Sequence, residues 1–157
     1  MTNALTLNAP VDTLAMEFTR EFDAPIAALY RAHADADLVK RWLGPHGLEM
    51  TVQEWEFRSH GGYRYTHTDE HGTYVFNGTF HTVRENELIV QTFEFGGAPD
   101  MVNIEYLWFD DLGDGRSRLR GRSVCPSTEA RDALLSSGME GGMSEGYDKL
   151  DALLPQL

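Results

Sequence analysis

Acidic side chains that stand next to aromatic residues are the first candidates for chemistry in this sequence. Glu94 lies between Phe93 and Phe95, and Glu105 precedes Tyr106. Successive side chains of a strand point to opposite faces, so each acid faces away from its aromatic neighbours. An acid that faces an apolar interior could grip a polar ligand group or act as a general acid or base. An acid that faces solvent would do neither, and the sequence leaves both readings open for Glu94 and Glu105.

One basic residue stands at a position where the pattern calls for an apolar one. Apolar and polar residues alternate from Leu14 to Phe22, which predicts a half-buried strand, and Arg20 shares the parity of the apolar face. A buried arginine needs a charge partner. We interpret Arg20 as a residue that lies at the sheet edge or pairs with an acid of the core. The alternative is a polar anchor inside a pocket.

The other residue types that carry chemistry form no catalytic pattern. None of the six histidines shows a metal-ligand spacing with cysteine or a carboxylate. The single cysteine, Cys125, has no base beside it, and the sequence holds no Gly-x-Ser-x-Gly motif and no phosphate-binding loop. We therefore expect no catalytic residue, no metal and no cofactor.

The charge balance restricts the classes of partner. The 157 residues include 25 acids and 13 bases, a formal net charge of −12, whereas phosphate binding needs clustered Lys and Arg. We expect no nucleic-acid partner. Four arginines alternate from Arg116 to Arg122 and would share one face of a strand. We interpret them as an exposed face balanced by nearby acids, and the alternative is a contact surface for an acidic partner.

The apolar segments bear on where the protein resides. No apolar run approaches the length of a membrane-spanning helix, and residues 1–13 lack the basic and apolar regions of a signal peptide. A lone cysteine cannot form an internal disulfide, which is typical of a reducing compartment. We expect a cytoplasmic protein with no membrane insertion.

Hydrophobic periodicity indicates the elements that position these residues. After a strand over 14–22, Pro25 suits a helix start, and two short helical segments lead to Gly44. Six further strands are predicted near 48–58, 62–68, 73–83, 87–95, 101–109 and 116–124. Short turns join them, so neighbouring strands should pair as antiparallel hairpins. The prediction is an α+β fold with a seven-stranded antiparallel sheet, in a single domain over 14–157 that follows a flexible segment 1–13.

The last thirty residues predict a long C-terminal helix. Ser127 or Thr128 can cap its start, and an apolar stripe of three- and four-residue spacings continues to Leu154. Four glycines, at 138, 141, 142 and 146, lie within or beside the stripe, and each costs about 1 kcal/mol relative to alanine. The glycines would either permit close approach to another element or leave room beside the helix. Alternatively, the helix breaks near Gly138.

Large aromatic and sulfur-containing side chains form the best candidate for a binding site. They recur on shared strand faces and on the stripe of the C-terminal helix, as expected for the wall of a concave apolar pocket. They could also simply fill the core. The candidate ligand-binding residues are Trp42, Trp55, Phe57, Tyr74, Phe76, Phe80, Tyr106, Trp108, Met139, Met143 and Tyr147, with Arg20, Glu94 and Glu105 as possible polar anchors.

Short motifs in a fixed order extend over nearly the whole chain after the first dozen residues. They are Arg20-Glu21-Phe22-Asp23-Ala24-Pro25, Arg41-Trp42-Leu43-Gly44-Pro45, Glu56-Phe57-Arg58, Gly61-Gly62-Tyr63-Arg64-Tyr65, Phe76-Asn77-Gly78-Thr79-Phe80, Gln91-Thr92-Phe93-Glu94-Phe95 and Ser137-Gly138-Met139-Glu140-Gly141-Gly142-Met143 before Tyr147-Asp148-Lys149-Leu150. This order resembles the SRPBCC superfamily, also called START-like or Bet v 1-like. Within it the chain looks like the family homologous to the activator of Hsp90 ATPase. Ser59-His60 lengthen one turn relative to that family, and Tyr147 stands where many relatives carry Trp.

The resemblance implies a helix-grip fold, in which a curved sheet wraps the C-terminal helix and leaves a cavity between them. Relatives include lipid and steroid carriers, polyketide cyclases, antibiotic self-resistance proteins and co-chaperone domains, so the fold does not specify one activity. We expect a non-enzymatic monomer or homodimer that binds a small hydrophobic or amphipathic molecule. The alternatives are a protein-binding module like the Hsp90 activator and an enzyme of the polyketide cyclase or hydratase kind.

Overall fold

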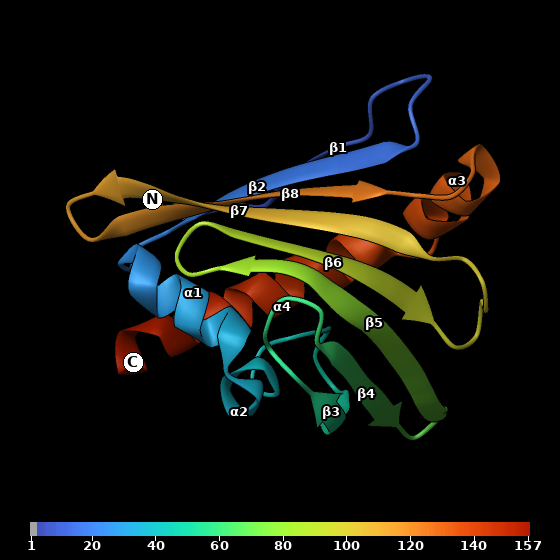
Figure 1. Cartoon of the computed structure of the whole chain (residues 1–157), viewed down its shortest axis with the longest axis horizontal. Coiled ribbons are helices and arrows are strands. Elements are labelled where there is room, and N and C mark those ends of the chain that lie inside the picture. Colours follow the sequence, from blue (N-terminus) through green and yellow to red (C-terminus); the bar gives the residue numbers. More distant parts are fainter. Residues whose placement is uncertain (1–2) are drawn as a thin grey trace.

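An eight-stranded antiparallel sheet bends around a long C-terminal helix in the computed structural model, which describes residues 3–157 (Figure 1). The strands are β1 (Thr6–Asn8), β2 (Ala15–Phe22), β3 (Glu49–Trp55), β4 (Gly62–Asp69), β5 (Gly72–Arg84), β6 (Leu88–Phe95), β7 (Asn103–Gly113) and β8 (Arg116–Val124). The helices are α1 (Ile26–Ala34), α2 (Ala36–Val39), α3 (Thr128–Ser136) and α4 (Met139–Leu153), and a 3₁₀ turn follows at Leu154–Gln156. The strand order β1-β2-β8-β7-β6-β5-β4-β3 contains the expected meander from β3 to β8.

The sheet has eight strands rather than the predicted seven. The additional strand is β1, where Leu7 lies opposite Phe18 of β2. This strand lies inside the segment 1–13 for which we expected flexibility, and three residues are too few to show a period-two pattern. Met1 and Thr2 of that segment lie outside the described residues.

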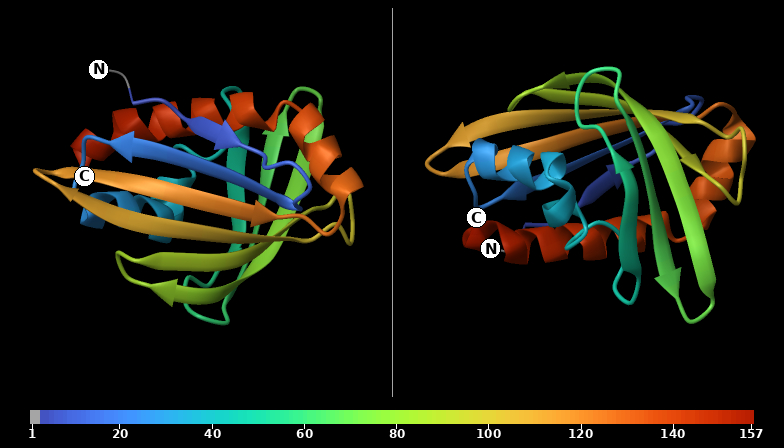
Figure 2. Two further views of the ribbon diagram at one scale, coloured as in Figure 1. Left: turned by 90° about the horizontal axis from the view of Figure 1, so that it is seen from above. Right: turned by 60° about the horizontal axis from the view of Figure 1, so that its bottom comes forward.

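The sheet curves enough to enclose the helix because its pairing is interrupted at three places. The register shifts in β3 between Val52 and Glu54, in β5 between Phe80 and Thr82, and in β7 between Asp111 and Gly113. Such bulges bend a strand and increase its twist. Figure 2 shows β4 and β5 crossing over one end of the helix while β2, β8 and β7 run along it.

The predicted C-terminal helix is two helices, α3 and α4, which meet at Gly138. Gly138 has a φ of +82°, a left-handed conformation that glycine adopts without strain. This was the alternative that the glycine content of the stripe left open. Gly146, further along α4, permits close approach instead. A Cβ atom there would lie 3.1 Å from the carbonyl oxygen of Trp42, so any larger residue would crowd the loop after α2.

The two helices after β2 are fastened to the core by tryptophan side chains. The Nε1 atom of Trp42 donates a hydrogen bond to the carbonyl oxygen of Ala32 at 2.9 Å, and that of Trp55 donates to Ala34 at 2.8 Å. Both acceptors belong to the last turn of α1 (Ile26–Ala34), where helical carbonyl groups lack partners within the helix. The bonds therefore fix the end of α1 against β3 and against the segment after α2.

Arg20 connects the sheet to α4. Its side chain is buried, and Nη1 lies 2.8 Å from Oδ1 of Asp148 while Nη2 lies 3.7 Å from Oδ2 of Asp151. The guanidinium also lies 5.3 Å from the ring centre of Phe22. The favoured interpretation, in which this arginine pairs with acids, is confirmed, although the acids belong to the half-exposed face of the helix.

The four arginines of β8 lie on the convex face of the sheet, and each has an acidic partner. Arg116 pairs with Asp23 at 2.8 Å and Arg122 with Glu17 at 2.8 Å. Arg118 and Arg120 share Asp110, at 3.0 and 2.6 Å. The interpretation as a strand face balanced by nearby acids is confirmed. Within residues 3–157, no helix combines the length and apolar character needed to cross a membrane.

The ion pair between Arg20 and Asp148 should contribute measurably to stability. Because Asp148 is partly exposed and Arg20 is buried, we expect a coupling free energy of about 1–2 kcal/mol, between the values of surface and buried pairs. A double-mutant cycle of Arg20→Met and Asp148→Asn, followed by urea unfolding, measures it. Asp132→Asn, an exposed acid of α3, is the control and should leave stability nearly unchanged. Additivity of the two substitutions to within about 0.3 kcal/mol would contradict the prediction.

Candidate functional site

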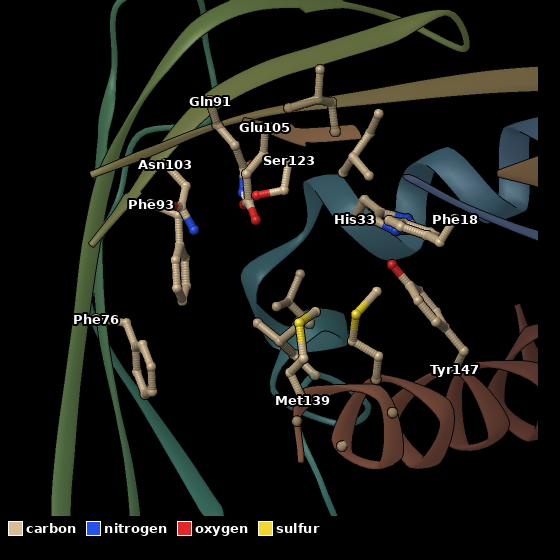
Figure 3. Close-up of a pocket in the computed structure, with 18 of the residues that line it drawn as sticks. Phe18, His33, Phe76, Gln91, Phe93, Asn103, Glu105, Ser123, Met139 and Tyr147 are labelled. Carbon is tan, nitrogen blue, oxygen red and sulfur yellow. Dashed lines mark hydrogen bonds between the residues drawn. The ribbon is translucent and has the colours of Figure 1, made fainter. Parts of the chain in front are cut away.

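A cavity of about 470 Å³ lies between the concave face of the sheet and the N-terminal half of α4. Its walls come from β1 to β8, from α1, from the segment Val39–Pro45, and from the α3–α4 junction and α4. Aromatic and aliphatic side chains make up most of the surface. Figure 3 shows Phe76 and Phe93 on the side of β5 and β6, with Met139 and Tyr147 rising from α4.

Most of the aromatic and methionine residues selected from the sequence meet in this cavity. Its lining includes Trp42, Trp55, Phe57, Phe76, Phe80, Tyr106, Met139, Met143 and Tyr147. Several of their rings contact one another over the concave face of the sheet. For example, the ring of Phe80 lies 5.3 Å from that of Trp55 and 5.0 Å from that of Phe57. Tyr106 differs, because its ring stacks with that of Trp108 on the other face of β7.

Two of the selected aromatic residues, Tyr74 and Trp108, lie outside the lining. Trp108 stacks with Tyr106 at 5.5 Å, beneath the guanidinium of Arg120 on the convex face. Alternation along β7 sends Glu105 inward and leaves Trp108 outward. Tyr74 lies near the turn end of β5, where its ring is 6.5 Å from that of Phe95.

Of the three possible polar anchors, one lines the cavity and two lie outside its lining. Arg20 belongs to the ion pair with α4, outside the lining. Glu94 accepts hydrogen bonds from Asn77 and from the backbone N–H of Asp100, and the latter bond is the main cause that lowers the pKa of Glu94. Only Glu105 reaches the cavity.

Glu105 stands in the middle of a polar row that crosses three strands. Gln91 of β6 lies opposite Glu105 of β7, which lies opposite Ser123 of β8. The Nε2 atom of Gln91 donates a hydrogen bond to Oε1 of Glu105 at 2.9 Å. The Oγ atom of Ser123 is buried and has no hydrogen-bond partner among residues 3–157. Figure 3 shows all three side chains directed into the cavity.

The surroundings of Glu105 disfavour its charge. The exposed area of Glu105 is intermediate because its carboxyl group borders the cavity, and the walls of the cavity surround that group. This burial raises the pKa of Glu105, and the hydrogen bond from Gln91 opposes the shift only in part. Among the described residues no lysine, arginine or histidine forms an ion pair with it.

Two histidines add neutral ring nitrogens to the cavity wall. The Nδ1 atom of His33 donates to the carbonyl oxygen of Leu29 at 2.8 Å, which leaves Nε2 as an acceptor without a partner among the described residues. Burial lowers the pKa of His33 to about 4. His67 also lines the cavity, and burial together with the charge of Lys149 lowers its pKa.

Sequence reasoning missed Gln91, Ser123, His33 and His67 as cavity residues. Signals for two of them were present. Gln91 shares its strand parity with Ile89 and Phe93, and His33 continues the helical stripe of Leu29 and Tyr30. Both are polar residues at apolar positions, the same type of exception that singled out Arg20. Within the described residues no group of three or more His, Cys, Asp or Glu could hold a metal ion.

His33 should make stability dependent on pH. Its pKa is about 4 in the folded protein against 6.5 for an unperturbed histidine, so its contribution is complete above about pH 6.5 and is lost as pH falls toward 4. Between about pH 7 and pH 5 the wild type should lose about 2 kcal/mol through this group.

Urea unfolding of His33→Gln, which keeps an N–H donor and removes the titration, measures this effect. The variant should lose correspondingly less stability over the same pH interval, while His71→Gln at an exposed histidine should follow the wild type. Parallel pH dependences of His33→Gln and wild type would show that His33 does not titrate as described.

Comparisons with known proteins agree with this geometry. The family model described as "Activator of Hsp90 ATPase homolog 1-like protein" matches residues 23–155. A crystal structure of a protein from Rhodobacter sphaeroides has a TM-score of 0.87 at 25% identity, covering 98% of this chain and 99% of the other. One from Mycobacterium smegmatis has a TM-score of 0.85 at 26% identity, covering 95% of each chain.

A solution structure of a protein from Arthrobacter aurescens also has a TM-score of 0.87, at 24% identity, with 97% of this chain and 92% of the other covered. No curated protein matches the sequence. The family model covers most of the chain, and the sheet wraps the C-terminal helical segment as the resemblance implied. The chain belongs to the family of activator of Hsp90 ATPase homolog 1-like proteins, within the SRPBCC superfamily.

Proposed function

We propose that this protein binds a small hydrophobic or amphipathic molecule in the cavity between the sheet and α4, without catalysing a reaction. The observation that supports the proposal best is the cavity itself. Protein interiors are close-packed, and voids much larger than a water molecule are few. A volume of about 470 Å³ with a mainly apolar wall that includes many aromatic rings lies in the usual range of small-ligand sites.

The α4 helix supports the proposal because it places a residue without a side chain, Gly142, in the wall of the cavity. Gly142 lines the cavity, and a Cβ atom there would meet Pro45 at 3.7 Å, which is an ordinary van der Waals contact. Room for a larger side chain exists at this position and is left unfilled. Met139 and Met143 on either side are flexible side chains, which adapt readily to a bound molecule.

Filling that room should block binding without unfolding the protein. Gly142→Leu places a branched side chain in the cavity, and we expect the affinity for the apolar fluorescent probe N-phenylnaphthylamine to fall about tenfold or more. Gly141→Leu is the matched control. It makes the same change one residue earlier, where a Cβ atom has nothing within 4 Å and the position is exposed.

Both substitutions remove a helical glycine, so both variants should be at least as stable as the wild type in thermal unfolding. Probe fluorescence and thermal shift together measure the outcome. Equal probe affinity in a folded Gly142→Leu variant, or equal losses in both variants, would contradict the proposed location. Native mass spectrometry and a thermal-shift screen of lipids, sterols and aromatic polyketides then identify the chemical class of the ligand.

A second candidate, an enzyme of the cyclase or hydratase kind, is favoured by one observation. Glu105 is a cavity-facing carboxyl group with a raised pKa, as a general acid or base requires. A ligand recovered chemically unchanged after incubation with wild type would support binding alone. Conversion by wild type and not by Glu105→Gln would support the enzyme. The protein-binding alternative had relied on the arginines of β8, and their acidic partners leave it without that support.

A further inference from the structure

The polar row of Gln91, Glu105 and Ser123 is flanked at each end by a buried apolar residue of the next strand. Across the sheet, Phe80 lies opposite Gln91, and Met16 lies opposite Ser123. Phe80 and Met16 are only 1% and 2% exposed. An isolated acid between such neighbours destabilises the fold unless something compensates its charge. Packing alone would favour an apolar residue at position 105.

Two oxygen atoms of the row have no hydrogen-bond partner among the described residues. Gln91 occupies Oε1 of Glu105, and no described residue donates a hydrogen bond to Oε2. Ser123 stands directly opposite with an Oγ atom that has no partner. Two acceptor oxygens on neighbouring strands thus face the same space. Asn103, two residues before Glu105 on the same strand face, adds an amide to this part of the wall.

From this geometry, and on the basis of the binding function proposed above, we infer that the natural ligand carries a cationic amine that pairs with Glu105 and Ser123. An ammonium group offers three donors and no acceptor, which suits two unused acceptor oxygens. Its charge would compensate the acid of the cavity lining, which forms no ion pair with a described residue. Charge-assisted hydrogen bonds of this kind are about twice as strong as neutral ones.

The rest of the cavity is compatible with a cation on an apolar body. Aromatic faces attract cations, and the rings of Trp55, Phe76 and Phe93 line the space beside the row. The two cavity histidines are neutral at physiological pH, because burial lowers the pKa of both. The net charge of −12 also attracts cations to the protein from solution.

Other titratable groups near Glu105 stay uncharged at neutral pH. Burial first, and the Glu105 carboxyl second, raises the pKa of Tyr63 and Tyr65 on β4 and of Tyr147 on α4. Burial also raises the pKa of the Cys125 thiol, against the charge of Arg131. Glu105, whose pKa is raised from the ordinary carboxyl value, is therefore the first acid of the cavity lining to ionise as pH rises.

Displacement of N-phenylnaphthylamine by three probes with one apolar chain tests the inference: decylamine, decanol and decanoate. High salt suppresses attraction of the amine to the acidic surface. Decylamine should displace the fluorescent probe at about tenfold lower concentration than decanol, and decanoate should be the weakest. The preference for amine over alcohol should grow as pH rises through the raised pKa of Glu105, because Glu105 ionises while the amine stays protonated.

Substitutions assign the preference to the row. Glu105→Gln should make decylamine and decanol equal and leave decanol unchanged, whereas Glu94→Gln, an acid of the adjacent strand outside the cavity, should retain the wild-type preference. Ser123→Ala should reduce it about threefold and provides a second test if Glu105→Gln does not fold.

The outcomes separate the ligand class from the binding function. Equal affinities for decylamine and decanol in wild type, or a preference that survives in Glu105→Gln, would overturn the amine and leave cavity binding intact. Failure of the fluorescent probe and of all three chains to bind wild type would overturn the proposed function and the amine together.

Discussion

The attachment of α4 to the sheet at one end is the constraint on which the cavity depends. Leu150, Leu153 and Leu154 are at most 4% exposed and belong to one core cluster with Phe22 of β2. Arg20 adds its ion pair with Asp148 at the same level. The first residues of α4, from Met139 to Met143, are at most partly buried and border the cavity. Sheet and helix therefore meet closely at one end and diverge at the other.

The position of the polar row follows from this divergence. Along β2 and β8, Arg20 lies opposite Leu119. Four residues earlier in β2, on the same face of the sheet, Met16 lies opposite Ser123. The first pair is beneath the packed half of α4, where a polar group needs a partner from the helix, and Asp148 supplies it. The second is beneath the α3–α4 junction, where Ala130 and Met139 pack against Met16 but no described residue forms a hydrogen bond with the Oγ atom of Ser123. Glu105 and Ser123 are tolerated there because the cavity can supply water or a ligand as the partner.

The sequence predicted the elements well because turns and alternation are local properties. The hairpins from β3 to β8 follow from short runs of Gly, Asp, Asn and Pro between alternating segments. The break at Gly138 was an open alternative, since the costs of several helical glycines do not reveal which one leaves the helical conformation. β1 was missed because its three residues gain their stability from pairing with β2 and not from their own pattern.

The candidate site was predicted less completely, for a reason specific to period-two strands. Alternation shows that Glu105 and Trp108 lie on opposite faces, but not which face is concave. Both faces of β7 are partly buried, since Arg120 covers Trp108 on the convex side. A residue such as Ser123 is typical of a solvent-facing strand, and only the tertiary structure shows that it faces the cavity. Fold membership leaves this choice open, because one backbone accommodates many ligands. The chemistry of the ligand must therefore be inferred from the few polar side chains that this chain places against its apolar wall, and the uncompensated carboxyl group of Glu105 is the most informative of them.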